Sequence, residues 1–305
     1  MSSSKNATFL FNRDFMDYHK DRFEDFSLLI FNDKKLVGLF PANKVEDTIY
    51  SHQGLTYGGL LTSENIKLEE FVSCFKSVLN FYKSFDCKSI QLKQLPSIYS
   101  SLPNNELQYL MFILKAELIR RDTLSVINMK RTLKVSKDRV AGNKRALKYG
   151  LRIEEVNDFE SFWNQILIPN LKMKHNTKPV HSLEEIQLLK EKFPNQIRQF
   201  NVYKNDQIVA GTTIFETNQV AHSQYISGNE EKNETGSLDF LHIHLINDVF
   251  KDKTCFDFGI SNEKQGKHIN RGLNYWKEGF GARTVTQDFY EINLSNTNNL
   301  ENIFI

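Results

Sequence analysis

The chain has 305 residues, a length that favours two domains over one core. Hydrophobic residues make up 40% of it and charged residues 25%, as in soluble globular proteins, and a formal net charge of +2 excludes a surface built throughout to bind a polyanion. Cys74, Cys87 and Cys255 lack C-x-x-C spacing, so we expect no metal site and no disulfide framework. No apolar run approaches the ~20 residues of a membrane-spanning helix, and the N-terminus does not resemble a signal peptide. We therefore expect a reduced, cytoplasmic protein.

The first half of the chain predicts a mixed sheet with helices. Hydrophobic periodicity and turn residues place the elements in this order: a helix at 13–26, a hairpin with strands at 28–31 and 36–41, strands at 47–52 and 55–61, an amphipathic helix at 68–85, a strand at 89–92, a helix at 103–115 and a strand at 117–129. Three glycines interrupt the pattern between Gly54 and Gly59. Glycines inside a strand mark a bulge or a close approach of ligand to backbone. We therefore expect Tyr57 and Gly58 to bind substrate as one wall of an interdomain cleft.

Residues 130–150 are rich in lysine and arginine and predict a helical linker between two domains. A run of charge is often no more than a solvated helix face. The alternative is a surface that binds a nucleotide, a CoA phosphate or an RNA acceptor stem, with Arg145 as the candidate substrate-binding residue.

The second half repeats the element order of the first. It predicts strands at 151–156, 197–203, 208–216, 220–227, 255–258 and 283–290, and helices at 158–174, from 182 to before Pro194, at 236–250 and at 269–277. The predicted fold is α/β with mixed, mostly antiparallel sheets, in domains at 1–129 and 151–294. The asparagine-rich tail, 295–305, is expected to be poorly ordered.

A loop that enters a helix at 234–238 is a candidate anion site. The first turn of a helix has unpaired N–H groups and a partial positive charge, which suit a phosphate. Gly236 would admit a ligand to the backbone, and Thr235, Ser237 and Leu238 flank it. An ordinary capped helix is the alternative.

Two further polar residues on strands are candidates for catalysis. Asp257 lies at the end of a strand segment that the sequence predicts to be buried. A carboxylate there can orient an amine or accept its proton. The alternative is that it forms hydrogen bonds to the turn at Gly259–Ser261. Tyr225 is either a general acid or a core residue. His222 lies three positions before Tyr225 on one strand, so only one of the two faces a central cleft.

The late helix within 272–282 carries Trp276 and Lys277 and breaks at Gly279 and Gly281 before the last strand. Such a helix can aim Lys277 into a cleft beside the sheet. The alternative is that Lys277 caps the helix C-terminus against its dipole.

Taken together, these segments resemble a known superfamily. The second half resembles the GNAT acyltransferase fold, and the chain from about 25 to 290 resembles small FemAB-like proteins, relatives of the peptidoglycan-bridge aminoacyltransferases, which have two GNAT-type domains. The matching segments are 36–41, 54–60, 209–211, 224–226, 236–238, 256–259 and 272–282.

The resemblance implies an enzyme that transfers an acyl or aminoacyl group to an amine. In GNAT enzymes the loop corresponding to 234–238 binds the CoA pyrophosphate, although this chain lacks the usual Arg/Gln-x-x-Gly-x-Gly/Ala pattern there. In the FemAB branch an aromatic–lysine pair serves the aminoacyl-tRNA and the transition state, and Trp276 and Lys277 occupy those positions. The resemblance thus makes Lys277 a catalytic candidate, beside Asp257 and Tyr225, which are candidates from their own sequence context.

Three functions remain open. The leading expectation is an N-acyltransferase that moves an acyl group from acyl-CoA, such as acetyl-CoA, to an amine of a cell-envelope precursor: an amino sugar, a sugar nucleotide or a peptidoglycan precursor. The first alternative is a FemAB-type peptidoglycan aminoacyltransferase that uses aminoacyl-tRNA and binds tRNA. The second is a non-catalytic GNAT-like binding protein.

Overall fold

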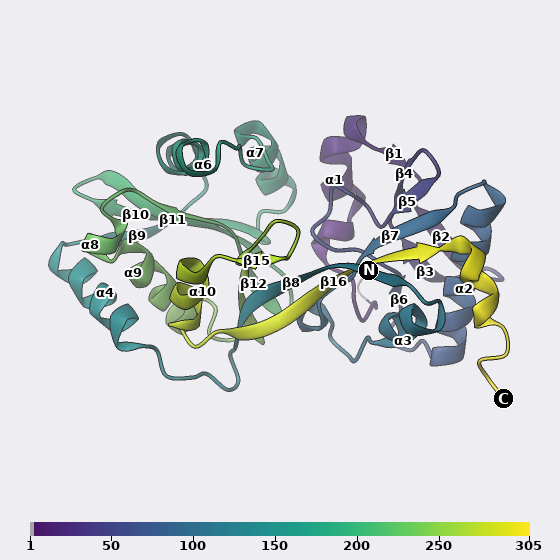
Figure 1. Cartoon of the computed structure of the whole chain (residues 1–305). Coiled ribbons are helices and arrows are strands. Elements are labelled where there is room, and N and C mark those ends of the chain that lie inside the picture. Colours follow the sequence, from purple (N-terminus) through teal and green to yellow (C-terminus); the bar gives the residue numbers. More distant parts are fainter. Residues whose placement is uncertain (1–2) are drawn as a thin grey trace. The chain divides into compact units, whose positions relative to one another are not determined.

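The structure, a computed structural model, describes residues 3–305, which form two compact units (Figure 1). Unit 1 comprises the chain up to Asp122 together with 264–268 and 286–305, and unit 2 comprises 123–263 and 269–285. Each unit contains a mixed sheet flanked by helices, so the predicted α/β class is confirmed.

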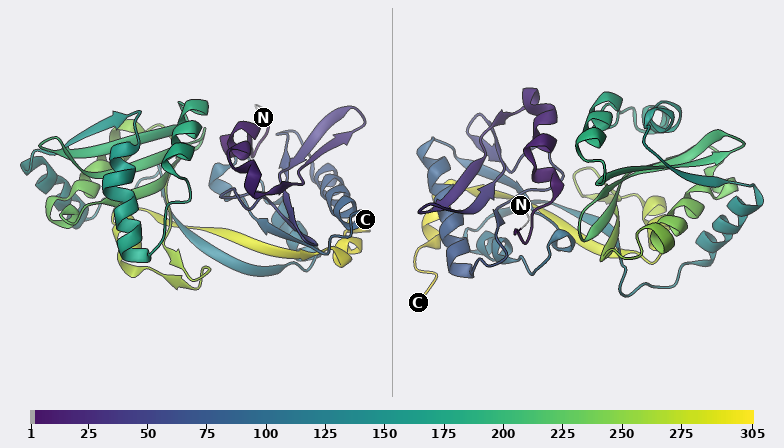
Figure 2. Two further views of the ribbon diagram at one scale, coloured as in Figure 1. Left: turned by 90° about the horizontal axis from the view of Figure 1, so that it is seen from above. Right: turned by 180° about the vertical axis from the view of Figure 1, so that it is seen from behind.

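The units do not follow the predicted boundaries. Strands β8 (Glu117–Asn128) and β16 (Arg283–Asn293) are hydrogen-bonded neighbours, and each passes from one unit into the other (Figure 2). The end of β16 pairs with β7 (Ser89–Lys93) from Phe289 to Asn293. These hydrogen bonds place the end of β16 in the sheet of unit 1, although it follows unit 2 in the sequence. The last 20 residues therefore belong to unit 1 instead of following a second domain.

Unit 1 has one sheet in the order β1-β4-β5-β7-β16 and a small sheet, β2-β3-β6. Its core packs around α2, whose predicted apolar stripe is buried, from Phe71 to Tyr82. Besides β7 and β16, its elements are the 3-10 helices η1 (Phe9–Phe11), η2 (Asp17–Arg22), η3 (Ser97–Tyr99) and η6 (Leu294–Leu300), the helices α1 (Arg13–Met16), α2 (Leu68–Ser84) and α3 (Glu106–Ile113), and the strands β1 (Glu24–Asp25), β2 (Leu28–Asn32), β3 (Lys35–Phe40), β4 (Asn43–Val45), β5 (Thr48–Tyr50) and β6 (Leu61–Thr62).

Three predictions for unit 1 are corrected. The helix expected at 13–26 ends at Met16 and continues as a 3-10 helix before β1. The tail expected to be poorly ordered contains η6, which buries Leu294, Thr297 and Leu300 against α2. The strand expected at 55–61 is irregular up to Leu60.

The irregular segment 51–60 fills the space beside β7. The parallel ladder of β5 and β7 ends at Tyr50↔Gln91, after which the amide of Ser51 donates to Gln91 O (2.9 Å) and that of Gly58 to Lys93 O (2.7 Å). A side chain at Gly58 would overlap with the Ser51 carbonyl oxygen, so the glycine permits this close packing.

Unit 2 has the sheet order β8-β13-β12-β11-β10-β9. Helices α6 and α7 cover one face of this sheet, and α4 and α9 cover the other (Figure 1). The elements are the strands β9 (Arg152–Val156), β10 (Ile197–Lys204), β11 (Gln207–Glu216), β12 (Val220–Gly228), β13 (Cys255–Ile260), β14 (Asn262–Glu263) and β15 (His268–Ile269), the helices α4 (Lys137–Lys148), α5 (Glu160–Phe162), α6 (Ile168–His175), α7 (Leu183–Lys192), α8 (Lys232–Thr235), α9 (Ser237–His244) and α10 (Arg271–Glu278), and the π-helical turns η4 (Trp163–Leu167) and η5 (Leu245–Val249).

The basic segment predicted as a linker is an integral part of unit 2. Its helix, α4, is capped by Ser136 and buries Gly142 and Ala146 against α9. A side chain at Gly142 would overlap with the Asp239 carboxylate, and one at Gly236 would overlap with the Gly142 backbone. The two glycines therefore let the helices approach closely.

Strands β12 and β13 separate after a short parallel ladder. They pair only from Val220↔Cys255 to His222↔Asp257, although β12 continues to Gly228 and β13 to Ile260. The register of β13 against β8 shifts between Asp257 and Ile260, where Gly259 has a φ of +69°. This bulge bends β13 away from β12 and leaves a gap between the two strands.

Candidate functional site

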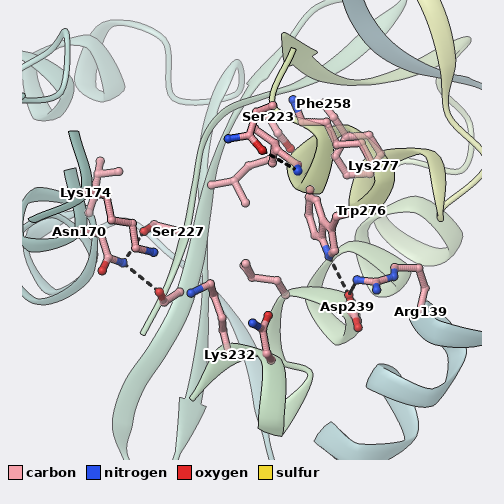
Figure 3. Close-up of a pocket in the computed structure, with 18 of the residues that line it drawn as sticks. Arg139, Asn170, Lys174, Ser223, Ser227, Lys232, Asp239, Phe258, Trp276 and Lys277 are labelled. Carbon is pink, nitrogen blue, oxygen red and sulfur yellow. Dashed lines mark hydrogen bonds and ion pairs between the residues drawn. The ribbon is translucent and has the colours of Figure 1, made fainter. Parts of the chain in front are cut away.

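A cavity of about 910 Å³ opens in unit 2 where β12 and β13 diverge (Figure 3). Its walls come from α4, α6, α8, β12, the start of α9, β13 and α10. The lining is partly apolar and partly polar. Its apolar surface comes from Leu171, Ile226, Leu238 and Phe258, and its polar groups include Asn170, Lys174, Lys232, Asp239 and Lys277. This volume lies in the range typical of small-molecule sites.

Lys277 lies at the wall of this cavity and is only 2% exposed. Its Nζ donates to the carbonyl oxygens of Gly259 (3.0 Å) and Ile260 (2.6 Å) on β13. It therefore binds a strand and does not cap its own helix, which excludes the capping alternative. Burial lowers the pKa of Lys277 to about 8, against the opposing effect of the Asp257 carboxylate.

Trp276 lines the same wall and is fixed by its indole N–H. The Nε1 donates to Asp239 Oδ1 (2.8 Å), which also accepts from Arg139 (2.7 Å). Figure 3 shows these three side chains together on one side of the cavity. Burial raises the pKa of Asp239, while Trp276 and Arg139 oppose that effect. Asp239 thus ties α4 and α10 to the start of α9.

Asp257 is fully buried and does not line the cavity. Its Oδ2 accepts from His222 Nδ1 (2.9 Å), and its Oδ1 accepts from the Gly259 amide (2.7 Å). The bond to the turn at Gly259, one of the two predicted alternatives, is therefore present, and the carboxylate also acts electrostatically on Lys277.

Tyr225 does not line the cavity and is buried in the core of unit 2. Its hydroxyl is 2.7 Å from His181 Nδ1, and its ring packs edge-on against Trp163. Burial raises the pKa of Tyr225 to about 12. This is the environment of the core tyrosine that was the alternative to a general acid.

The predicted anion loop is largely used for packing. Thr235 is buried and donates to Glu231 O (3.0 Å), Gly236 packs on the α4 backbone, and Ser237 is fully buried. Leu238 alone of the four lines the cavity. Arg145 also lines it, but its guanidinium donates to the Asn233 and Glu234 carbonyl oxygens of α8.

Tyr57 and Gly58 belong to the packed interior of unit 1. The Tyr57 hydroxyl donates to Thr8 (3.1 Å), its ring packs on Tyr99, and it is 2% exposed. The structure therefore gives these two residues a packing role where the sequence predicted a wall for substrate.

Several cavity residues were not predicted from the sequence. Lys174 and Lys232 line the cavity from α6 and α8, opposite Trp276 in Figure 3. Burial, followed by the nearby charge of Lys174, lowers the pKa of Lys232. Asn170 donates to Ser227 Oγ (2.8 Å) and Gly228 O (2.9 Å), which fixes the end of β12. Single lysines in polar segments carry no sequence signal, so only the fold identifies them.

Within residues 3–305, no group of three metal-ligating side chains comes together. No helix in this described part combines the length and apolar character needed to cross a membrane.

No protein-family model matches the chain, and no curated protein matches its sequence. Its structure is similar to that of FemX, with a TM-score of 0.68 at 10% identity over 98% of this chain and 96% of that one. It is also similar to the C-terminal domain of a putative lysylphosphatidylglycerol synthetase from Agrobacterium fabrum, with a TM-score of 0.61 at 12% identity over 89% and 85% of the two chains. L-PGS from Bacillus licheniformis gives a TM-score of 0.60 at 11% identity over 88% and 84%. The predicted GNAT-like, FemAB-like fold is thereby confirmed.

Proposed function

We propose that the protein is an N-acyltransferase whose transfer site is the cavity of unit 2. The observation that carries this proposal is the buried Lys277 ammonium at the wall of a cavity formed by diverging parallel strands. The similarity to FemX and to two proteins named for lysylphosphatidylglycerol synthesis supports an acceptor from the cell envelope. The cytoplasm remains the predicted compartment.

In this reaction the unprotonated amine nitrogen of the acceptor attacks the acyl carbonyl carbon, and the bond from that carbon to the donor's sulfur or oxygen atom breaks. The proton that the nitrogen loses ends on this leaving atom, directly or through water. Negative charge develops on the carbonyl oxygen, and Lys277, which is 2% exposed at the cavity wall, supplies a preorganised positive donor. One such donor contributes about 3–4 kcal/mol of transition-state stabilisation in comparable sites. Asp257 of β13 and His222 of β12 do not line the cavity.

An acyl-CoA is the donor that we propose first. The β12–β13 ladder ends at His222↔Asp257, so the backbone of β12 beyond this point is open to an extended ligand that forms strand-like hydrogen bonds, as the amides of a pantetheine arm can. Lys174 and Lys232 provide positive charge for phosphate groups at the same cavity. The acceptor amine would belong to an amino sugar, a sugar nucleotide or a peptidoglycan precursor.

The test is calorimetric titration with acetyl-CoA and longer acyl-CoAs, followed by transfer assays on a panel of amino-sugar nucleotides. Ile226→Trp, which fills the cavity, is expected to abolish donor binding. Val180→Trp, at a position 72% exposed, is the matched control and should bind as the wild type does. If no acyl-CoA binds, or if Ile226→Trp binds it equally well, the CoA proposal is wrong.

An aminoacyl-tRNA donor is the second candidate. It is favoured by the packing of Gly236 against α4, which occupies the position where a CoA pyrophosphate was expected, and by the Trp276–Lys277 pair in the cavity. It predicts transfer from charged tRNA and salt-dependent tRNA binding. Lys144→Glu with Lys148→Glu, two exposed positions of α4, should weaken that binding. Arg145 is unsuitable for this test because it holds α8.

A non-catalytic binding protein with this fold is the remaining alternative. In that case Lys277→Ala would change local stability alone. A large loss of a demonstrated transfer activity in this variant, with ligand binding retained, would exclude it.

A further inference from the structure

His222, which the proposed reaction does not use, stands at the point where β12 and β13 separate. It forms the last residue pair of their ladder, opposite Asp257. Its side chain is 14% exposed, whereas that of Asp257 is completely buried. A carboxylate accepts hydrogen bonds, so the 2.9 Å contact between His222 Nδ1 and Asp257 Oδ2 has the histidine as donor.

Asp257 in turn fixes the bulge in β13. Its second oxygen, Oδ1, accepts from the Gly259 amide at 2.7 Å, in the segment where the register against β8 shifts. Gly259 has a φ of +69°, a conformation that residues other than glycine rarely adopt. A Cβ atom there would come within 3.2 Å of the His222 ring, so the glycine also makes room for the histidine.

The bulge presents two consecutive carbonyl groups to Lys277. Gly259 O and Ile260 O accept from Nζ at 3.0 and 2.6 Å. A regular strand would point consecutive carbonyl groups to opposite sides, so the bulge is what allows both to meet one ammonium. The titratable groups that face Lys277 are Asp257 of β13, His222 through Asp257, and His242 of α9.

We propose that His222 is the positioning residue of this site: it holds Asp257, Asp257 holds the bulge at Gly259, and the carbonyl groups of the bulge hold the Lys277 ammonium at the cavity wall. The structural part of this proposal stands by itself. Its consequence for catalysis rests on the proposed acyl transfer.

The structural part is tested by NMR titration of the full chain carrying lysine labelled with ¹³C at Cε, with the Lys277 signal assigned from Lys277→Met. In the wild type Lys277 should titrate near pH 8. His222→Gln and His222→Phe lack a donor at the Nδ1 position, so Lys277 should titrate at least about half a pH unit lower, because its charged form loses acceptors. His222→Asn places an amide N–H near the Nδ1 position and should restore the wild-type titration.

The matched control is His244→Gln. His244 forms a similar histidine–aspartate contact, 2.8 Å from Asp248, on the exposed side of unit 2. This variant should leave the Lys277 titration unchanged. Identical Lys277 titrations in the wild type, His222→Gln and His222→Phe would overturn the proposal. So would a shift in His222→Asn as large as that in His222→Gln, because the donor would then not matter.

The catalytic part uses the transfer assay. His222→Gln is expected to lower kcat about tenfold with little change in KM, and His222→Asn to retain most of kcat, because a misplaced Lys277 affects the transition state more than donor binding. If the wild type shows no transfer at all, the proposed function fails, while the NMR arm still decides whether His222 positions Lys277. A His222→Gln enzyme with a displaced Lys277 titration and wild-type kcat would refute the catalytic part alone.

Discussion

His242 offers a test of the structure that does not depend on function. It is fully buried in unit 2, and its ring is packed among those of Phe256, Phe258, Trp276 and Phe280. Its Nδ1 is bonded to Leu238 O (2.9 Å), and a carbonyl only accepts, so Nδ1 carries the proton. Burial lowers the pKa of His242 from its ordinary 6.5 to about 4.

The lowered pKa of His242 sets how the free energy of unfolding changes with pH. Because the folded-state pKa lies below the unfolded one, the stabilisation from neutral His242 is complete above about pH 6.5 and is lost as the pH falls towards 4. At 1.36 kcal/mol per pH unit, this window corresponds to about 3 kcal/mol of unfolding free energy. His242→Phe removes the titrating group and leaves an aromatic ring in an aromatic cluster. We therefore expect this variant to lose about 3 kcal/mol less stability than the wild type between pH 7 and pH 4.

The measurement is urea unfolding at a series of pH values, followed by tryptophan fluorescence and far-UV circular dichroism. Both tryptophans, Trp163 and Trp276, lie in unit 2, so fluorescence reports the unit that contains His242. His52, whose pKa burial also lowers to about 4, lies in unit 1 and contributes to the total loss in both proteins. His244→Gln, at a partly exposed position of α9, is the control. Equal losses of stability in the wild type and His242→Phe would refute the reasoning.

Three further predictions follow from the site and its packing. Lys277→Met is expected to lower kcat of the proposed transfer by a factor of about 10²–10³. In the wild type kcat should fall as the pH rises through about 8, where Lys277 loses its proton, and this fall should be absent in the variant. A pH–rate series checks both results, and a variant with wild-type kcat would contradict them. Gly142→Ala should destabilise unit 2 by about 1–3 kcal/mol because the added methyl group overlaps with Asp239. Gly272→Ala, whose methyl group would have only Asn270 Oδ1 near it at 3.8 Å, should be neutral or stabilise by up to about 1 kcal/mol. Similar urea midpoints for the two variants would argue against the α4–α9 contact. Trp276→Phe should cost about 1–3 kcal/mol, since the buried Asp239 carboxylate loses its indole donor, and an unchanged midpoint would show that the bond contributes little.

Local patterns predicted much of the fold. The apolar stripe of α2, the start of α7 after position 182, and the neighbouring strands β10 and β11 depend on residues close in the sequence, and all are present. The end of β16 joins unit 1 by pairing with β7, and η6 is buried against α2. Both partners lie about 200 residues earlier in the chain, and hydrophobic periodicity gives no information on such distant contacts.

The candidate site divides in the same way. Trp276, Lys277 and Leu238 were recognised from a helix that breaks at glycines and from the loop before α9, and they do meet in one cavity. Gly236 was misread because the sequence does not tell whether a glycine admits a ligand or another helix. Its partner, Gly142, lies 94 positions earlier, in the segment that the sequence predicted as a helical linker.

The two units show why a perturbed lysine does not by itself identify a site. In unit 1, Lys93 Nζ donates to two backbone carbonyl groups, those of Gln53 and Leu55, both at 2.9 Å, and burial lowers the pKa of Lys93 to about 8. Lys277 of unit 2 has the same number of carbonyl partners and a pKa lowered to about 8 by the same cause.

What differs between the two lysines is the space that they face. In unit 1 the acceptors of Lys93 belong to segment 51–60, which itself fills the gap beside β7, so the lysine holds a loop in place. In unit 2 the acceptors of Lys277 belong to the bulge of β13, and the gap beside β12 is a cavity of about 910 Å³. The same electrostatic arrangement is therefore structural in unit 1 and available to a ligand in unit 2. If Lys93→Met abolished a transfer activity that Lys277→Met left intact, this assignment of roles would be reversed.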